Sequence, residues 1–481
     1  MATTTAQYAQ GFATLTEEVS LDRVPLRGEL PDWLEGTLLR TGPAQWEVGA
    51  STLRHWFDGL AMLHAFAFSG GAVSYANRFL QSRAKQAADA AGRQVYGEFA
   101  TDPCRSIFQR VHALFRPQVT DNANVNVVRL GERFVALTET PMAVEFDPDT
   151  LATLGYPRWA PGHVTTAHPH ADRATGEALN YVTRFGPRTV YEVYGMAAPG
   201  ARPRTIATVP ASPAAYMHSF GLSERYVVLV EFPLVVHPLD LVLGRAPFAE
   251  CFAWEPERGT TVTVVARDDG RVRGRFRTDP FFAFHHVNAF EQGDDRLVVD
   301  LCAYDDASIV SSLFLDRLRG AAPTGAGVPD AFLTRCEVDL VGGAVTTRRL
   351  SQTPLELPRV NYGAVNERPY RWVWGAARGA GAPADAFIDQ LVKVDVDSGA
   401  AVTWSQAGCW PGEPVFVAAP GGAAEDDGVC LSVVLDGARG TSFLLVLDAA
   451  DLTELARAEV PHHIPFSFHG QFARHSTRAP E

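Results

Sequence analysis

The sequence contains no long apolar run. Its longest such stretch, residues 226–236, is interrupted by Glu231 and Pro233 and is too short to cross a bilayer as a helix. The first residues, MATTTAQYAQGF, have no basic segment followed by an apolar core, so we expect no signal peptide. The 6 cysteines are scattered without a Cys-x-x-Cys pair. This argues against a disulfide framework or a thiolate metal site and predicts a cytoplasmic protein.

Positive charge is also scarce. Lysine and arginine number 42 against 55 acidic residues, which gives a formal net charge of −13. A nucleic-acid partner requires a basic surface, and we therefore expect none. The sequence also lacks a serine nucleophile elbow, a P-loop and a G-x-G-x-x-G turn before a helix, which removes the common hydrolase and nucleotide-binding sites from consideration.

Short hairpins dominate what is present. A charged turn repeatedly precedes a short apolar run, as in GERFVALTE, SERYVVLVE, GDDRLVVDL and EDDGVCLSVVLD. Strand-like runs at 36–43, 60–68 and 72–79 are separated by glycine-containing turns. Similar hairpins at wide spacing predict an all-β fold of stacked antiparallel sheets, for which a β-propeller is the most economical architecture.

The chain shows no change of composition that would divide it. We therefore predict one domain over residues 21–481, preceded by a flexible, loosely held arm at residues 1–20, which are small and polar.

One segment has helical rather than strand periodicity. In residues 104–117 the apolar side chains at 107, 108, 111, 114 and 115 fall on one helical face, with arginines between them. A basic amphipathic helix over 105–116 would lie on a membrane surface, and the apolar loop 233–248 would extend that patch. A helix packed on the core explains the spacing equally well. The first interpretation predicts peripheral contact with the inner face of a membrane.

Four histidines stand out by their surroundings. His168, His218 and His285 are each followed by a polar turn and an apolar run, and His469 has aromatic neighbours in FSFHGQF. Equivalent positions in successive hairpins would bring these imidazoles to one point. The alternative is four separate histidines, each bonded to a backbone carbonyl, because a buried polar group needs a partner. The shared pattern favours the common site.

Four converging imidazoles would bind a transition metal. Four protein ligands usually make a closed zinc site, whereas ferrous iron accepts more ligands and would keep room for dioxygen or substrate. Metal-bound histidines normally donate their other N–H to a carboxylate or a carbonyl. Glu139, Glu356 and Glu413 lie in apolar or turn-rich contexts, and we expect them to take that supporting role.

The motifs around these residues resemble those of the carotenoid cleavage dioxygenases. The similarity runs from Trp33 to Phe472 and includes LLRTGPAQWEVG, HWFDGLAMLHAF, TDNANVNVV, LTET, TAHPH, YMHSFGLSERYVVLVE, FHHVNAFE, ELPRVN, GEPVFV and FHGQF. It implies a seven-bladed β-propeller with loops and short helices over one face. It also implies a non-haem Fe(2+) held by histidines and supported by glutamates.

The family's F-H-x-x-N pattern selects His285 in the FHHVN segment and leaves His286 as the alternative. Position by position, the resemblance implies four ligands and three supporting carboxylates: His168, His218, His285 and His469, with Glu139, Glu356 and Glu413.

The resemblance also implies a substrate tunnel. Phe57 and Phe99 match tunnel aromatics, and Val125 matches a residue that crowds the open coordination position. Thr138 stands where stilbene-cleaving relatives carry a lysine, which favours an aliphatic polyene as substrate.

The implied reaction is cleavage of a carotenoid or apocarotenoid C=C bond by Fe(2+) and O2 to two carbonyl products. The motifs are most similar to the animal β-carotene oxygenase and retinoid isomerohydrolase branch, which favours central (15,15′) cleavage of β-carotene to retinal. The alternatives are an isomerohydrolase of retinoid esters, a stilbene-cleaving oxygenase, and a non-catalytic propeller scaffold.

Overall fold

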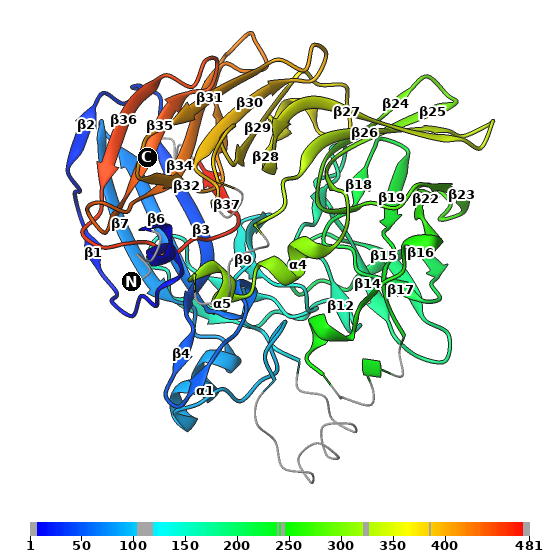
Figure 1. The fold of residues 1–481 in the computed structure, drawn as a ribbon, viewed down its shortest axis with the longest axis horizontal. Helices are drawn as coiled ribbons and strands as arrows, with labels where there is room; N and C mark the ends of the chain where they lie inside the picture. Colours follow the sequence, from blue (N-terminus) through cyan, green and yellow to red (C-terminus); the bar gives the residue numbers. More distant parts are fainter. Residues whose placement is uncertain are drawn as a thin grey trace, which may run out of the picture.

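The computed structural model describes residues 7–102, 119–237, 240–241, 246–320, 327–383 and 386–474. Within these ranges the chain consists mainly of antiparallel β-strands with a few short helices (Figure 1). The prediction of an all-β fold is confirmed. The strand-like runs at 60–68 and 72–79 are strands β6 (Leu60–Ser69) and β7 (Ala72–Phe79), which pair with each other.

Among the described residues, seven sheets have four or more strands, and we number them by their order around the molecule. Sheet 1 contains β1 (Ser20–Leu21), β7, β6, β3 (Gly36–Gln45) and β37 (Gly470–Ala473); sheet 2 contains β11 (Thr153–Gly155), β10 (Val144–Phe146), β9 (Arg133–Leu137) and β8 (Asn126–Leu130); sheet 3 contains β12 (Val164–Thr165), β13 (His170–Ala171), β14 (Ala178–Arg184), β15 (Val190–Met196) and β16 (Arg204–Pro210).

The other four sheets follow along the chain. Sheet 4 contains β18 (Gly221–Leu222), β19 (Tyr226–Glu231), β22 (Thr260–Ala266) and β23 (Val272–Thr278); sheet 5 contains β24 (Phe282–Gln292), β25 (Arg296–Tyr304), β26 (Phe332–Asp339) and β27 (Val345–Pro354); sheet 6 contains β28 (Glu356–Arg359), β29 (Trp372–Ala377), β30 (Gln390–Asp395) and β31 (Ala401–Ser405); sheet 7 contains β2 (Leu26–Gly28), β36 (Glu454–Glu459), β35 (Thr441–Asp448), β34 (Gly428–Asp436), β32 (Cys409–Pro411) and β33 (Val415–Ala418). Two smaller sheets contain β17 (Ala214–Ala215), β20 (Leu234–Val236) and β21 (Ala253–Trp254), and β4 (Glu47–Val48) and β5 (Ser51–Thr52).

Apolar side chains join each large sheet to the next. Sheet 1 packs on sheet 2, and the same kind of contact links every following pair up to sheets 6 and 7. Sheet 7 then packs on sheet 1, for example through Leu431 and Phe66, both fully buried. The core is therefore a cyclic series of sheet-to-sheet contacts rather than one central layer.

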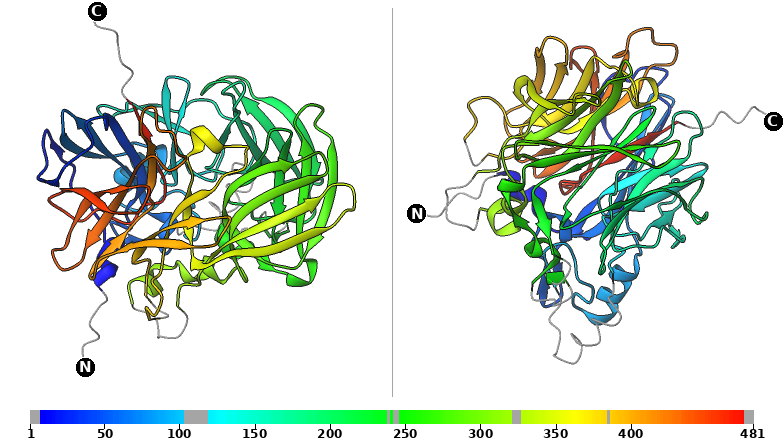
Figure 2. Two further views of the ribbon diagram at one scale, coloured as in Figure 1. Left: turned by 90° about the horizontal axis from the view of Figure 1, so that it is seen from above. Right: turned by 90° about the vertical axis from the view of Figure 1, so that its right-hand side faces the viewer.

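The two ends of the chain share sheets. Strand β37 pairs with β3, with Arg40 opposite Gly470, and β2 pairs with β36 in sheet 7. Strands from near the two ends of the chain accordingly lie side by side, blue beside red (Figure 1, Figure 2). This pairing joins the first and last parts of the core.

The start of the chain differs from the loose arm expected at residues 1–20. Residues 7–12 form the 3₁₀ helix η1 (Gln7–Phe12). The Phe12 side chain is fully buried, and its ring centroid lies 5.5 Å from that of Trp56 and 5.1 Å from that of Phe466. Residues 8–15 are thus buried or half-buried against the core, whereas residues 16–18 and 20 are exposed.

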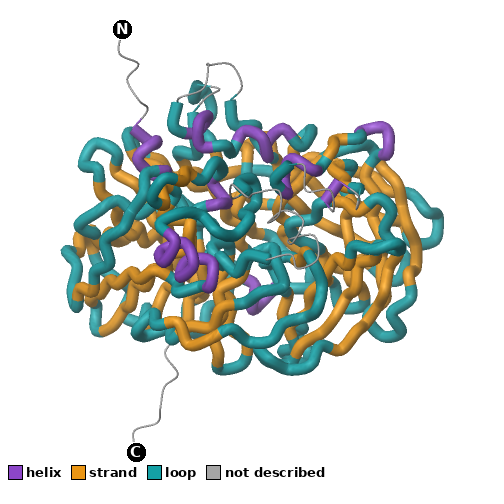
Figure 3. Tube along the Cα trace, turned by 90° about the horizontal axis from the view of Figure 1, so that it is seen from below, coloured by secondary structure: helices purple, strands orange, loops and turns teal. Residues whose placement is uncertain are grey.

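Short helices connect the sheets, and Figure 3 shows several of them along one side of the strands. The longest of those described is α1 (Arg83–Ala91), which the sequence analysis missed; Ser82 caps its first turn, and Gly92 ends it at φ 59°. The others are α4 (Ser308–Ser312), α5 (Leu315–Leu318), α6 (Tyr362–Val365), η2 (Trp56–Asp58), η3 (Phe248–Cys251) and η4 (Pro256–Arg258). None of the helices in the described part of the chain has the length and apolarity to span a membrane.

Of the two segments expected to face a membrane, the structure describes only part of one. The predicted helix at 105–116 lies outside the described residues. Within 233–248, the side chains of Leu234, Val235 and Val236 are buried in strand β20. The prediction that 233–248 forms an exposed apolar loop is therefore wrong for this strand, because its apolar side chains are already covered by the protein.

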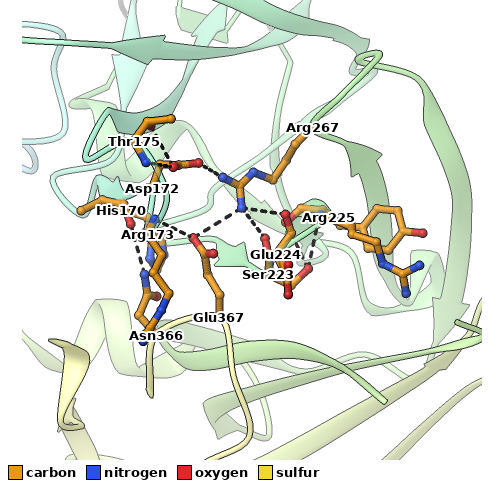
Figure 4. Close-up of polar contacts among 12 residues, drawn as sticks. His170, Asp172, Arg173, Thr175, Ser223, Glu224, Arg225, Arg267, Asn366 and Glu367 are labelled. Atoms are coloured by element: carbon orange, nitrogen blue, oxygen red, sulfur yellow. Dashed lines mark hydrogen bonds and ion pairs between the residues drawn. The ribbon is translucent and has the colours of Figure 1, made fainter. Parts of the chain in front are cut away.

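A buried ion network holds two neighbouring sheets to the loop after α6 (Figure 4). The Arg267 guanidinium, at the end of sheet 4, donates to the Asp172 carboxylate in sheet 3. It also donates to the carbonyl of Ser223 at 2.6 Å and lies 3.4 Å from the Glu367 carboxylate. Because the partners come from separate sheets, the network fixes their relative position.

Candidate metal centre

Each large sheet contributes one residue to a common centre. His285 lies within β24 of sheet 5, and the other histidines stand one to three residues before an edge strand. In order from sheet 1 to sheet 7 the contributed residues are His469, Glu139, His168, His218, His285, Glu356 and Glu413. The similar hairpins of the sequence thus place similar positions at one point.

The structure brings the four predicted histidines together. One ring nitrogen from each of them falls within a group whose members are all within 4.8 Å of one another. The Nε2 atoms of His168 and His218 are 3.1 Å apart, and those of His285 and His469 are 3.0 Å apart. His168 is half-buried and the other three are buried. His286, the alternative to His285, lies outside this group, and its Nδ1 contacts the Ser219 hydroxyl at 2.8 Å.

Each of the three predicted glutamates contacts one histidine through Nδ1. The distances are 2.7 Å from Glu139 to His218, 2.6 Å from Glu356 to His285 and 2.7 Å from Glu413 to His469. A carboxylate at Nδ1 accepts its N–H, so the Nε2 atom of the same neutral ring presents a lone pair. All three lone pairs are then directed at the common point.

This arrangement favours a cation at the centre. In the His285–His469 pair, two Nε2 lone pairs face each other at 3.0 Å, and neutral rings of this tautomer have no proton to place between them. Protonation would relieve the repulsion, but burial lowers the pKa of His469 to about 3. A divalent metal ion satisfies all the lone pairs at once, so the donor set fits a metal that prefers imidazole nitrogen.

The Glu413 carboxylate is the most enclosed of the three. Burial by itself opposes its ionisation, but the charge of Arg359, the hydrogen bond from His469 and the charge of Arg40 outweigh that effect and hold the pKa of Glu413 below its usual value. Burial also opposes ionisation of Glu356, and His285 reverses the balance and lowers the Glu356 pKa. These two carboxylates are therefore ionised at neutral pH and accept the histidine N–H as anions.

An apolar cavity opens against the cluster. The space between atoms there, open solvent included, is about 820 Å³, and the walls include His218, His285 and His469 together with Phe57 and Val125. Apolar walls around a few polar atoms are typical of a site for an apolar ligand. The structure thus places two of the four predicted tunnel residues on the cavity wall.

The other two predicted tunnel residues are further from the cavity. Phe99 packs behind Phe57, with ring centroids 5.2 Å apart, and is not part of the wall. Thr138 is half-buried beside Glu139 and does not line the cavity either. Both positions therefore act on the cavity only through a neighbour.

Sequence reasoning missed three residues that contact the glutamates. The Tyr216 hydroxyl donates to Glu139 at 2.8 Å, and both Arg40 and Arg359 lie within 3.3 Å of Glu413. Tyr216 lies two residues before His218 in the YMH motif, and Arg359 lies three residues after Glu356 in the ELPR motif. This proximity in sequence could have identified both residues. Arg40 has no such neighbour in sequence among the predicted site residues.

The chain matches one family model over residues 12–474, that of the retinal pigment epithelial membrane protein. It belongs to this family, the carotenoid oxygenases. Among its relatives, the carotenoid isomerooxygenase of Galleria mellonella is 37% identical over 488 residues, covering 94% of each chain. The β,β-carotene 15,15′-dioxygenase of Rattus norvegicus is 34% identical over 515 residues, covering 95% of this chain and 90% of the relative.

Solved structures of the family share the fold. A variant of the Synechocystis apocarotenoid oxygenase superposes with a TM-score of 0.86 at 27% identity, covering 97% of this chain and 98% of the other. The cobalt-substituted Synechocystis oxygenase gives the same TM-score and identity, with the same coverage. The histidine cluster of this chain therefore lies within a carotenoid oxygenase fold, which makes the centre its candidate functional site.

Proposed function

We propose that the chain is an Fe(2+)-dependent dioxygenase that cleaves a C=C bond of a carotenoid or apocarotenoid. Its first substrate in this proposal is β-carotene, cleaved centrally at the 15,15′ bond to retinal. The observation that carries the proposal is the apolar cavity whose wall includes three of the four clustered histidines. A long apolar polyene fits such a cavity and would present a double bond to the centre.

Each group of side chains at the centre has its own role in this proposal. His168, His218, His285 and His469 would hold the iron, which when bound supplies the means to activate dioxygen. Glu139, Glu356 and Glu413 accept the Nδ1 protons and so fix the tautomer and the angle of three rings. Phe57 and Val125 exclude water from the wall and limit where the polyene can lie.

The seven large sheets would be the blades of a β-propeller with the centre on its axis. Two observations support this arrangement. The sheets pack in a cyclic order that returns to sheet 1, and each sheet contributes one residue to the centre. The structural likeness to the Synechocystis enzyme supports the same architecture.

A second outcome at the same centre is cleavage coupled to cis/trans isomerisation. The relative from Galleria mellonella is named a carotenoid isomerooxygenase and is 37% identical to this chain, slightly more than the 34% of the rat 15,15′-dioxygenase. The geometry of the products distinguishes the two reactions, because only the second yields a cis product from an all-trans substrate.

The proposal also states where the protein acts. A cytoplasmic protein would contact the inner face of a membrane through residues 105–116 and take its apolar substrate from that membrane. The helical spacing of apolar and arginine residues there supports this. Replacing Phe108 and Phe115 by aspartate should release the protein from liposomes, and unchanged co-sedimentation would contradict membrane contact through this segment.

One experiment tests the reaction. The protein is purified without oxygen, loaded with Fe(2+) and mixed with β-carotene in detergent under air, while oxygen uptake is recorded and the products are separated by HPLC. We expect retinal with stoichiometric oxygen consumption, and loss of both in His218→Ala. Bound iron with no β-carotene turnover would contradict the substrate and direct the assay to apocarotenoids. A parallel assay with a retinoid ester tests the alternative, because conversion of the ester to a retinoid alcohol without oxygen uptake would contradict the dioxygenase and indicate an isomerohydrolase.

A further inference from the structure

The three glutamate–histidine pairs differ in which other groups contact the carboxylate. Glu139 is contacted by the neutral hydroxyl of Tyr216. Glu356 accepts the backbone N–H of Leu357 at 2.6 Å in addition to its histidine, and the neutral hydroxyl of Tyr304 also interacts with it. Glu413 alone contacts two arginine side chains. Its side chain is also fully buried, whereas the side chains of Glu139 and Glu356 retain 11% and 13% of their exposure.

The two arginines hold Glu413 from opposite ends. The Nε–H of Arg359 donates to Oε1 at 2.8 Å, and Oε1 also accepts from His469 Nδ1. The Arg40 guanidinium lies 3.3 Å from Oε2, which also accepts the backbone N–H of Gly470 at 3.0 Å. Each carboxylate oxygen is therefore held both by an arginine side chain and by a group at position 469 or 470.

The same arginines also bind the main chain on each side of His469. Arg40 donates to the carbonyl of Phe468 at 3.0 Å and to the hydroxyl of Ser467 at 3.1 Å. Arg359 donates to the carbonyl of Gly470. The carbonyls immediately before and after His469 are thus held by separate arginines, which come from sheets 1 and 6.

The local packing leaves no room for another side chain here. A Cβ at Gly470 would lie 2.5 Å from Cγ of Arg40 and 2.8 Å from the carbonyl oxygen of Leu39. Glycine at this position allows Arg40 to pass against the backbone and reach the carboxylate. The arrangement has no counterpart at His218 or His285 among the described residues.

We propose that Arg40 and Arg359 form a clamp that positions His469 and sets the affinity of the centre for its metal ion. The inference rests on the metal centre of the proposed function, but not on its substrate. Neither arginine lies within the group of ligand atoms. They are positioning residues that act through Glu413 and through the backbone of His469.

Charge gives the physical reason for the clamp. An ionised carboxylate without access to water is costly unless it is paired and hydrogen-bonded. Three carboxylates around one divalent cation would leave the buried centre with an excess of negative charge, and two arginines reverse that excess. The clamp therefore lets the most deeply buried glutamate remain an anion that orients its histidine.

The alternative is that Arg40 and Arg359 only join strands and contribute to stability alone. A matched control for this is Arg335, which makes a bidentate pair with buried Asp300, both contacts being 2.8 Å, in sheet 5. Neither Arg335 nor Asp300 contacts a histidine of the cluster in the described structure. Loss of that pair should lower stability and leave the metal affinity unchanged.

The test measures Co(2+) binding to the metal-free full-length protein. Variants Arg359→Gln, Arg359→Lys and Arg40→Lys are compared with wild type and with Arg335→Gln. The dissociation constant comes from competition with a chelator, the visible absorption of bound Co(2+) reports the ligand geometry, and circular dichroism gives the melting temperature of each metal-free variant.

We expect Arg359→Gln to weaken Co(2+) binding by about 10–100-fold, the range for a lost partner of a metal ligand, and to change the visible spectrum. Arg359→Lys should fall between Gln and wild type, because it keeps the charge but loses one of the two contacts. Arg335→Gln should bind Co(2+) as wild type does. Arg359 keeps 29% of its side-chain exposure, so its variants remain informative if Arg40→Lys does not fold.

A double variant tests the route of the effect. If Arg359 acts through Glu413 and His469, adding Arg359→Gln to Glu413→Gln should weaken binding far less than it does in wild type. Wild-type affinity and spectrum in Arg359→Gln, with only a lower melting temperature, would overturn the clamp. Wild-type protein that binds no Co(2+) would overturn the metal centre itself.

Discussion

Replacing Glu413 or Glu356 by glutamine should have very different effects on the stability of the metal-free protein. Both substitutions keep an oxygen that can accept from a histidine Nδ1, and both remove one negative charge. Glu413→Gln leaves Arg40, whose side chain is 1% exposed, without an anion. Glu356→Gln strands no arginine or lysine, since none contacts Glu356 among the described residues.

The size of the difference follows from the cost of a stranded buried charge. Removing one partner of a buried ion pair costs about 3–5 kcal/mol. The unfolding entropy of a chain of 481 residues, at about 2.1 cal/mol/K per residue, is about 1 kcal/mol/K. Glu413→Gln should therefore lower the melting temperature of the chelated protein by about 3–5 °C, whereas Glu356→Gln should change it by no more than about 1 °C.

Differential scanning calorimetry in the presence of a chelator measures both values. Adding Arg40→Met to Glu413→Gln should recover part of the loss, because the second substitution removes the stranded cation. Equal melting temperatures for the two glutamine variants would refute the reasoning. So would a further fall on addition of Arg40→Met, since Arg40 would then stabilise the fold without Glu413.

Three further predictions follow from other parts of the structure. Val125→Phe fills the cavity wall beside the histidines and should lower kcat/KM for β-carotene by about 10-fold or more without loss of bound iron, which metal analysis and steady-state kinetics check together. Burial lowers the pKa of His64 to about 3. In the unfolded chain this histidine takes up a proton below about pH 6.5, so the free energy of unfolding decreases as the pH falls. This residue alone should cost about 2 kcal/mol of stability by about pH 5. His64→Gln should remove this pH-dependent loss of stability and so flatten the pH dependence of the melting temperature, and an unchanged slope would contradict the prediction. Phe12→Ala should cost about 3–5 kcal/mol because the ring is fully buried, and denaturation with no change in midpoint would show that residues 7–20 are dispensable.

The strands were predictable where the sequence pattern is local. Alternating and apolar runs bounded by glycine turns place β6 and β7 correctly because a hairpin is specified by neighbouring residues. Helix α1 was missed because it is short and buries only three of its residues. Its alanine content and its caps, Ser82 and Gly92, were the available signals.

The histidines could be predicted as a group because each repeats the same surroundings in a similar hairpin. The support around them could not be predicted in the same way. Arg40 is 373 residues from Glu413 in sequence and Arg359 is 54 residues from it, and an arginine near a strand gives no local sign of its partner. Such pairs are created by the packing of sheet on sheet, which one sequence does not encode in a readable pattern.

The burial of the N-terminal segment shows the same limit. Half of residues 7–20 are polar, and the ends of a chain are commonly mobile. Phe12 nevertheless packs among aromatic rings from η2 and from residues 387 and 466. One large apolar side chain can anchor a polar segment when distant parts of the chain provide its pocket.

The distribution of the centre over the sheets has a consequence for folding. The four clustered histidines come from sheets 1, 3, 4 and 5, and the glutamates that contact three of them come from sheets 2, 6 and 7. His469, the last of the four histidines in the chain, precedes β37, which completes sheet 1 by pairing with β3. A chain that ends before His469 would therefore lack both this imidazole and the β3–β37 pairing. Because the four imidazoles come from four sheets and the glutamates that contact them come from the other three, the complete centre requires all seven sheets, and a bound metal would in turn stabilise the folded state against partly folded ones.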